Sequence, residues 1–282
     1  MSSSPSSSVQ AARKALADRL REIRKDANLT AADVAGRTGW YRSKVSRLEN
    51  AVTPPSDNDI RAWCRACDAD AMADDLIAAS RLADNMYIDW RRLQRTGLRR
   101  LQESYVPLFE RTRSFRIYCS NVVPGILQTD GYARALLGSI ATFRGTPDDV
   151  SEAVEARLER SRVIREGDHR FALLVEEAVL RHRVGGAEVM AGQLGHLLSV
   201  MALPSVSLGV IPFSADRRMW MLETFSVYDE AQAQVELLTA QVNVTAPSEV
   251  EQYLKAFREF AKLAVYGAGA RARITAAVDA LG

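Results

Sequence analysis

Residues 37–47 carry four cationic side chains and no acidic one. Helical spacing brings several polar side chains of this segment to one outward face, namely Arg42, Ser43, Lys44 and Arg47. Arginine can pair bidentately with guanine in the major groove of DNA, and lysine can neutralise phosphate. We therefore predict a face that binds double-stranded DNA. In this prediction the base edges are read by Arg42, Ser43 and Arg47. The DNA backbone is held by Lys44 and Tyr41.

The neighbouring residues predict the elements that position this face. Thr30 can cap a helix, and Asp33 lies three residues further on, where its charge also suits the positive end of the helix. Gly39 is predicted to form the turn after this helix, because glycine adopts a positive φ without steric cost. A second short helix follows, with an inward stripe of Trp40, Val45 and Leu48. Residues 29–50 therefore predict two short helices joined by a tight turn.

The flanking sequence completes a five-helix domain. A helix with an apolar stripe is predicted over residues 12–27, before the motif. Ser56 and Asp59 form a capping pattern that opens a fourth helix, and residues 72–80 supply the fifth. The predicted inward residues of these flanking segments are Leu16, Leu20, Ile23, Leu29, Ile60, Trp63, Cys64, Cys67, Leu76 and Ile77.

The motif resembles the helix-turn-helix of the lambda-repressor/Cro-like (XRE-type) family. The matching positions are Thr30, Val34, Ala35, Gly39, Ser43, Val45, Ser46, Glu49 and Asn50. The resemblance implies that residues 42–47 form the face of the recognition helix and that Asn50 with Ala51 closes it. The full set of predicted DNA-contact residues is Thr30, Tyr41, Arg42, Ser43, Lys44, Arg47 and Asn50. The alternative interpretation is a five-helix fold used for protein contacts only.

Two positions depart from the family pattern. Ala31 stands where the family commonly has a glutamine that contacts phosphate or base. Tyr41 stands where the recognition helix usually has a serine or threonine cap. Losing such a cap costs roughly 1 kcal/mol, although a tyrosine can itself touch DNA.

At 282 residues the chain is long enough for a second domain of ordinary size. We predict a disordered serine-rich tail over 1–9, the helix-turn-helix domain over 10–80, a basic helical linker over 81–116 and a second domain over 117–282. Residues 91–116 hold eight arginines against two acids. Because proline is absent from 82 to 106, one long helix interrupted at Gly97 is predicted there. Its arginines could contact flanking phosphates, an acidic partner, internal acids or only solvent.

The second domain is predicted to be mixed α/β, in a chain that is mainly α. Strands are expected at four places, residues 171–175, 206–212, 225–228 and 235–239. Helices are expected over residues 109–120, 130–137, 149–166, 176–182, 188–201, 248–265 and 271–281.

This second portion resembles the large C-terminal domain, of uncharacterised activity, found in many actinobacterial regulators. The resemblance rests on residues 123–135, 177–181, 184–186, 193–194 and 210–212, and the first of these segments is the most specific. Such proteins look like antitoxin-type transcriptional regulators, among them the WhiJ-like developmental regulators, and are typically encoded beside a small partner protein. The resemblance implies a repressor whose DNA binding that partner modulates. Residues 157–162 depart from an R-x-x-R-Q-like string common in relatives.

Other groupings of chemical residues predict no enzyme, cofactor or metal. Cys64 and Cys67 supply only two ligands, too few for a zinc site, although redox sensing is an alternative to simple burial. Glu176, Glu177 and His182 could form an acid/base group, but a solvated or internally paired edge is the favoured interpretation. A ligand pocket is the stronger alternative, and the residues that could line it, or simply form core, are Met219, Trp220, Met221, Phe225 and Tyr228.

Three cysteines in a chain of this length favour a reducing compartment, and no apolar run approaches the thickness of a bilayer. We predict a cytoplasmic, nucleoid-associated homodimer, because two recognition helices can then meet half-sites about one DNA turn apart.

The predicted function is a sequence-specific DNA-binding regulator, with a metabolite-gated sensor as the alternative. A pure interaction scaffold is the third possibility.

Overall fold

The computed structural model describes residues 5–85, 87–89, 97–238 and 240–282. The chain divides into two compact units. The N-terminal unit comprises Met1–Tyr87 with Asn243–Val250, and the C-terminal unit comprises Ile88–Val242 with Glu251–Gly282.

The N-terminal unit contains the five predicted helices. They are α1 (Pro5–Asp26), α2 (Ala31–Thr38), α3 (Arg42–Glu49), α4 (Asp57–Ala66) and α5 (Ala73–Asn85), with a short 3-10 turn η1 (Asp70–Met72) before the last. Helix α1 begins at Pro5, inside the segment predicted to be a disordered tail, and residues 1–4 lie outside the described residues.

The core of this unit is built from the inward stripes that the sequence predicts. Leu20, Val34, Val45 and Ile60 are all fully buried. Trp63 lies among them, and its indole N–H donates to the Leu20 carbonyl at 3.1 Å. This bond satisfies the one polar atom of the Trp63 side chain, so the ring can fill the centre of the helix bundle.

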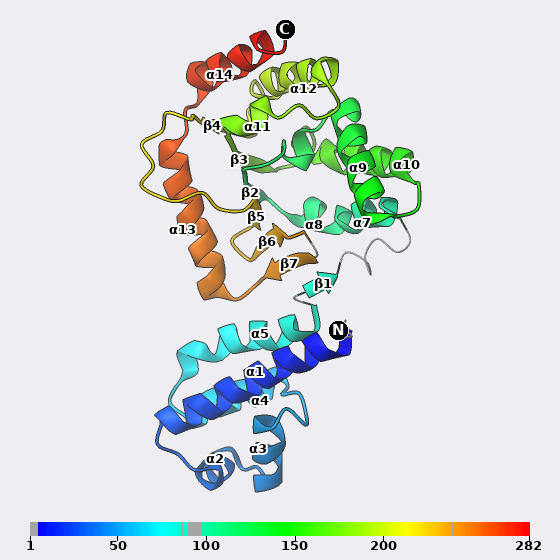
Figure 1. The fold of residues 1–282 in the computed structure, drawn as a ribbon. Helices are drawn as coiled ribbons and strands as arrows, with labels where there is room; N and C mark the ends of the chain where they lie inside the picture. The colour runs from blue at the N-terminus through cyan, green and yellow to red at the C-terminus, as the bar shows by residue number, and fades with distance from the viewer. Residues whose placement is uncertain (1–4, 86, 90–96, 239) are drawn as a thin grey trace. The chain divides into compact units, whose positions relative to one another are not determined.

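The C-terminal unit is a mixed α/β structure (Figure 1). Its strands are β2 (Ser114–Cys119), β3 (Arg170–Glu176), β4 (Val206–Ile211), β5 (Phe225–Tyr228), β6 (Gln232–Glu236) and β7 (Ala240–Val244). Its helices are α7 (Arg99–Ser104), α8 (Val106–Arg111), α9 (Asp130–Arg144), α10 (Val150–Arg160), α11 (Glu177–Arg181), α12 (Ala187–Val200), α13 (Pro247–Leu263) and α14 (Gly267–Asp279), with 3-10 turns η2 (Gly125–Leu127) and η3 (Ser161–Ile164).

The sheet has the order β1-β7-β6-β5-β2-β3-β4, where β1 is Tyr87–Asp89. Strands β2, β3 and β4 are parallel, whereas β5 runs antiparallel to both β2 and β6. On one face Phe115 and Ile117 of β2 join a core with α12 and α14. On the other face Tyr118 stacks on Phe260 of α13, with ring centroids 4.2 Å apart. The alternation of side chains along β2 therefore supplies both layers of the core.

The structure corrects the prediction of a helix over residues 109–120. Helix α8 ends at Arg111, and β2 occupies Ser114–Cys119 between β3 and β5. Both faces of β2 are covered, so apolar residues occur on both of them. Its sequence therefore lacks the regular apolar–polar alternation by which a surface strand is predicted. Strand β7 is likewise absent from the prediction, and β6 lies three residues earlier than predicted. The described C-terminal unit accordingly has more strands than the four predicted.

The prediction of one long helix over residues 82–106 is also wrong for those of its residues that the structure describes. Helix α5 ends at Asn85, strand β1 follows, and Gly97 has a φ of +98°. A Cβ at Gly97 would lie 2.0 Å from the Asp149 carboxylate, which accepts from the N–H groups of Leu98 and Arg99. Helix α7 then packs against α10, so residues 97–116 belong to the C-terminal unit rather than to a linker. The arginines at 91, 92 and 95 lie outside the described residues.

Candidate nucleic-acid interface

Helices α2 and α3 are held in place by the caps and the turn that the sequence predicts. The Thr30 hydroxyl accepts from the Asp33 N–H at 3.2 Å, and the Asp33 carboxylate accepts from the Thr30 N–H at 2.7 Å. This reciprocal pair is a complete capping box. Gly39 ends α2 with a φ of +70°, the left-handed conformation that favours glycine.

Helix α3 has one buried side and one exposed side. Val45 and Leu48 are buried against the other helices of the unit. Tyr41 is the N-cap but makes no side-chain capping bond, as expected for a residue without a short hydroxyl side chain. Asn50 is the C-cap, and Ala51 follows with a φ of +54°. The predicted end of the recognition helix at Asn50 and Ala51 is confirmed.

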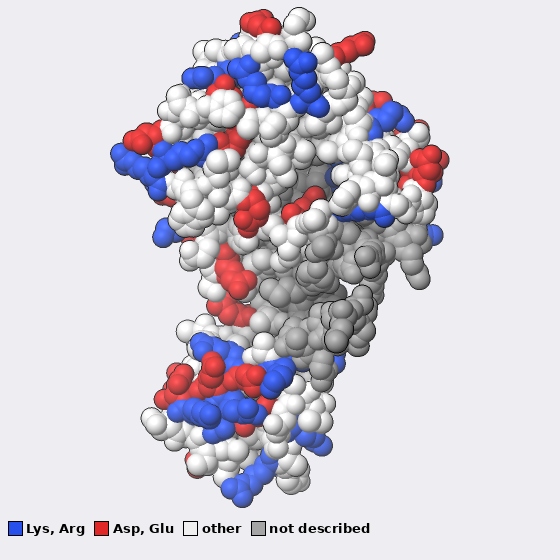
Figure 2. All heavy atoms as spheres, in the orientation of Figure 1, with Lys and Arg blue, Asp and Glu red and all other residues white. Residues whose placement is uncertain are grey.

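The exposed side of α3 brings together the residues predicted to read DNA bases. Arg42, Ser43 and Arg47 are all exposed, and Tyr41 beside them is 85 % exposed. Neither Arg42 nor Arg47 has a side-chain hydrogen bond or ion pair within the described residues. In Figure 2 blue spheres stand out among white ones at the lower tip of this unit, whereas blue and red spheres alternate along α1. The guanidinium groups on α3 are therefore available to an external anion.

Lys44 is placed differently from its neighbours. Its side chain is half-buried, and its ammonium donates to the Asp59 carboxylate of α4. The same ammonium lies 4.2 Å from the centroid of the Trp40 ring. The charge of Lys44 is thus already paired, and the residue ties the start of α3 to the start of α4. The sequence predicts Asp59 only as a capping residue. In the structure its carboxylate accepts from both the Ser56 N–H and the Lys44 ammonium.

Thr30 and Asn50 are exposed, but their side chains already have partners within the unit. The Thr30 hydroxyl is engaged in the capping box with Asp33. The Asn50 amide donates to the Ser46 carbonyl at 2.8 Å, and its oxygen accepts from Arg21 at 3.1 Å. In the structure both residues shape the ends of helices.

A buried ion pair that sequence reasoning missed anchors the far end of α3. Arg24 of α1 donates to both carboxylate oxygens of Glu49, at 2.6 and 3.2 Å, and also to the Leu29 carbonyl at 2.8 Å. The side chains of Arg24 and Glu49 are only 13 % and 8 % exposed. One guanidinium therefore joins α1, the entry to α2 and the end of α3. The sequence feature that could have indicated this pair is Glu49 itself, an acid at the end of an otherwise cationic stretch.

Comparison with known proteins agrees with this geometry. A family described as a helix-turn-helix domain matches residues 15–78, which contain all of α2, α3 and α4. A domain of unknown function, DUF5753, matches residues 102–276, more than half of the chain. The chain belongs to the DUF5753 family. No curated protein and no solved structure matches it.

The helix-turn-helix match indicates that this DUF5753 protein is a DNA-binding regulator, while its larger C-terminal portion matches a domain of unknown function. Among the described residues, no helix is both long enough and apolar enough to cross a membrane.

The cysteine pair of this DUF5753 protein is buried in the N-terminal core. Cys64 and Cys67 are 0 % and 5 % exposed, and neither forms a disulfide bond within the described residues. Burial raises the pKa of Cys64 to about 11 and also raises the pKa of Cys67. Since the thiolate is the reactive form, this environment suits a structural role better than redox sensing.

The carboxylates considered as an acid/base group in the C-terminal unit are paired internally. Glu176 accepts from the Tyr118 hydroxyl at 2.9 Å and from the Arg217 guanidinium. Glu177 accepts from the Phe213 N–H at 3.1 Å, whereas exposed His182 lies against the Asn121 carbonyl. Both carboxylates are therefore paired within the protein, as the favoured interpretation predicts.

The residues considered for a ligand pocket are not brought together. Phe225 and Tyr228 belong to the core of the sheet, at 0 % and 5 % exposed. Trp220 and Met221 are exposed on the loop between β4 and β5. This loop also carries Met219, and because Trp220 and Met221 face solvent while Phe225 and Tyr228 lie in the core, the five residues do not line one pocket.

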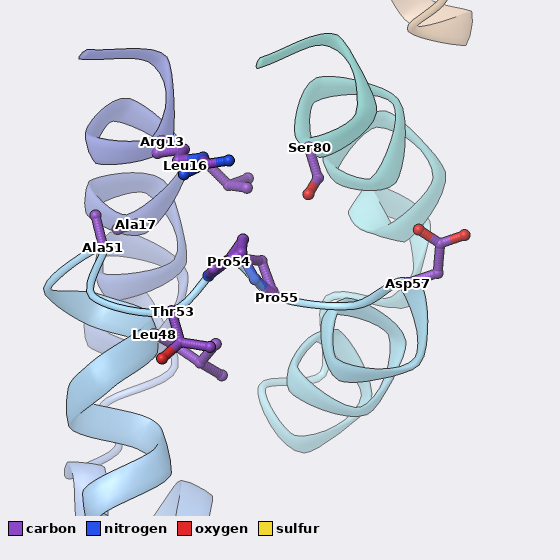
Figure 3. A pocket seen from close by; sticks show the side chains of 10 residues that line it. All are labelled: Arg13, Leu16, Ala17, Leu48, Ala51, Thr53, Pro54, Pro55, Asp57 and Ser80. Carbon is purple, nitrogen blue, oxygen red and sulfur yellow. The ribbon is translucent and has the colours of Figure 1, made fainter. Parts of the chain in front are cut away.

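A hollow of about 210 Å³ lies in the N-terminal unit, between α1, α5 and the loop after α3 (Figure 3). Leu16 and Ser80 approach it from opposite helices, and Pro54 and Pro55 form its floor in this view. The predicted DNA-contact residues do not line it. The hollow is accordingly separate from the exposed side of α3.

The Asp59 carboxyl makes the stability of the N-terminal unit depend on pH. Burial raises the pKa of Asp59, but hydrogen bonds from Lys44 and Ser56 outweigh burial and hold the pKa below its usual value of 3.8. Such a group stabilises the fold above its unfolded pKa, and this stabilisation is lost as the pH falls through the lower folded pKa. We expect acidification below about pH 4 to lower the Tm of the wild type more than that of Asp59→Asn. Thermal melting between pH 3 and 7 measures this, and equal declines would contradict it.

Restoring a cap at position 41 should stabilise α3. Tyr41 has the extended backbone of an N-cap, with φ −76° and ψ 144°, so a threonine hydroxyl there can reach the free N–H groups. We expect Tyr41→Thr to raise the free energy of unfolding by about 1 kcal/mol relative to Tyr41→Ala. Urea denaturation compares the two variants, and identical midpoints would show that the cap does not form.

Proposed function

We propose that this protein is a sequence-specific transcriptional regulator of the lambda-repressor/Cro-like (XRE-type) kind. The observation that carries the proposal is the exposed side of α3, where Arg42 and Arg47 flank the predicted base-reading position Ser43 and, within the part of the chain that the structure describes, are not paired to acids. A helix with unpaired arginines on one side and a buried stripe on the other fits the major groove while remaining attached to its domain.

The proposed contacts divide by chemistry. Arg42, Ser43 and Arg47 read base edges, and the exposed Tyr41 contacts the DNA backbone beside them. We assign Lys44 a positioning role, because a phosphate contact would require it to leave Asp59. Thr30 and Asn50 act through the helix ends that they shape, and their exposure leaves them within reach of a phosphate.

Selection of bound sequences from a random DNA pool tests this proposal. We expect a recurring motif and an affinity that falls steeply with salt, since cationic contacts release counterions from DNA. A pool without enrichment, together with salt-independent binding, would reject DNA recognition and favour a protein-interaction scaffold.

We further propose that the protein acts as a homodimeric repressor in the cytoplasm, associated with the nucleoid. A dimer would place two α3 helices in half-sites about one helical turn, or 34–36 Å, apart. The expected operator is therefore an inverted repeat with that spacing. Light scattering of the free protein and of its DNA complex measures the stoichiometry.

The C-terminal unit is proposed to mediate dimerisation and to bind a small protein encoded by a neighbouring gene, as in antitoxin-like and WhiJ-like regulators. Purified neighbouring gene product is expected to form a defined complex with the full chain and to change its affinity for the selected DNA. Absence of a complex would remove the partner from this proposal without affecting DNA recognition.

The second candidate function is a metabolite-gated sensor. A cavity lined by cationic side chains in the C-terminal unit favours it. A ligand that binds one DNA-competent state better than another would shift the population between states.

A further inference from the structure

A cavity of about 290 Å³ lies in the C-terminal unit beside the middle of the sheet. Its walls come from α8, β2, α9, α10, β5 and β6. Apolar side chains such as Ile117, Ile126 and Ile140 form much of the surface. The lining residues Asn121 and Glu236 are exposed, so the cavity can be reached from solvent there. Its size is at the lower end of the range for small-molecule sites.

Two arginines of α10 line this cavity. Arg157 is half-buried, and it donates to the side-chain oxygens of Gln102 and Gln128 at 3.0 and 2.6 Å. Arg160 is only 9 % exposed, and its Nε and Nη1 have no hydrogen-bond partner among the described residues. Its guanidinium lies 4.6 Å from the centroid of the Tyr105 ring. Within the described residues, neither arginine is paired with a carboxylate at ion-pair distance.

A buried guanidinium without a counter-ion is costly, because burial removes the water that solvates its charge. The same desolvation, together with the charge of Arg160, lowers the pKa of Arg157 to about 10. Aromatic rings offset part of the cost through cation–π contact but cannot accept the in-plane N–H groups as an oxyanion does. Among the described residues, Nε and Nη1 of Arg160 are therefore left unsatisfied, and such exceptions are rare in native structures.

The surroundings favour a ligand on the cavity side of Arg160. A second hollow also touches Arg160, but its lining sets three carboxylates, those of Glu110, Glu159 and Glu166, against the guanidinium groups of Arg160 and Arg162, so it favours an anion less than the cavity does. In the cavity itself the lining acid is Glu236, which is exposed at the end of β6. Two guanidinium groups against one exposed carboxylate leave the cavity cationic.

We infer that this cavity binds a small organic carboxylate, whose oxygens accept from Arg160 and whose apolar body lies against the isoleucine-lined wall. The mixture of one charged end and several apolar walls argues for an organic acid rather than for a bare inorganic anion. This inference concerns the C-terminal unit alone and holds whether or not the N-terminal unit binds DNA.

Calorimetric titration of the full chain with benzoate and hexanoate tests the site, with benzamide and inorganic phosphate as comparisons. We expect saturable binding of at least one carboxylate, and binding at least tenfold weaker for benzamide and phosphate. At ten times its Kd the carboxylate should raise the Tm of the C-terminal unit by about 3–6 °C.

Variants separate a ligand-binding role of Arg160 from a structural one. Arg160→Met is expected to abolish carboxylate binding and to leave the Tm of the free protein unchanged or higher, since an unsatisfied buried charge is removed. The control Arg162→Ala removes an exposed arginine of η3, paired with Glu159, and should keep full affinity. Ile140→Trp keeps Arg160 but fills the cavity, and should also abolish binding.

Three results would each overturn the inference. They are failure of both carboxylates to bind, equal affinity for benzoate and benzamide, and undiminished binding by Arg160→Met. If Arg160→Met does not fold, Arg160 has a structural role, and Ile140→Trp becomes the deciding variant. Carboxylate binding by folded Ile140→Trp would then show that the ligand binds outside this cavity.

Discussion

Replacing Arg42 and Arg47 together by alanine is expected to reduce specific DNA affinity by roughly 10²–10⁴-fold while leaving the fold intact. Each arginine that pairs with a guanine contributes about 1–3 kcal/mol of discrimination, or roughly 5–150-fold. Both side chains are exposed, and in the described structure they make no hydrogen bond or ion pair that folding would lose. Surface substitutions of this kind change stability by about 0.5 kcal/mol or less. Fluorescence anisotropy at fixed salt, on the selected DNA and on a scrambled sequence, measures the effect.

The single variants distinguish base contacts from phosphate contacts. Loss of a base contact should weaken binding to the selected sequence more than to the scrambled one, whereas loss of a phosphate contact should weaken both equally and reduce the salt slope by about 1. The matched control is Arg19→Ala, which removes an exposed arginine of α1 that is paired with Glu22. Equal loss of affinity in Arg19→Ala and Arg47→Ala would show that α3 does not read the DNA.

Replacing Glu49 by alanine is expected to destabilise the N-terminal unit by about 3–5 kcal/mol. Removal of one partner from a buried ion pair leaves the other charge desolvated without compensation. Here Arg24, with only 13 % of its side chain exposed, would lose both of its carboxylate bonds. Because domains are typically stable by only about 5–15 kcal/mol, this loss is a large fraction of the total.

Glu22→Ala is the control for this second experiment. Glu22 pairs with Arg19 on the exposed side of α1, where both side chains are about half exposed or more. Such surface pairs contribute about 0–1 kcal/mol. Urea denaturation followed by tryptophan fluorescence reports on this unit through buried Trp63. If Glu49→Ala and Glu22→Ala unfolded at the same urea concentration, the Arg24–Glu49 pair would not anchor α3.

Much of the N-terminal unit could be predicted because its determinants are local. The caps at Thr30 and Ser56 act on N–H groups three residues away, and Gly39 sets its own backbone angle. Inward stripes such as Val45 and Leu48 follow from helical periodicity alone. These short-range rules also place Arg42, Ser43 and Arg47 on the exposed side of α3.

The role of Lys44 could not be predicted in this way. Its sequence neighbours are those of a DNA-facing lysine, but its partner Asp59 lies 15 residues later, on another helix. Strand β2 was misassigned for a related reason. Residues 114–119 form a strand because β3 and β5, both distant in sequence, bond to its two edges. Local propensity is overridden when a segment is buried on both faces of a sheet.

By itself, therefore, the sequence determined the helix-turn-helix motif, its caps and its exposed arginines, because each depends on residues within one or two helical turns. Only the tertiary structure decided which polar groups are already paired. It placed Lys44 on Asp59 and Arg24 on Glu49 across 25 residues, and it left two buried nitrogen atoms of Arg160 without a hydrogen-bond partner among the described residues. These outcomes depend on desolvation and on contacts between distant segments, which become defined only when the chain has folded.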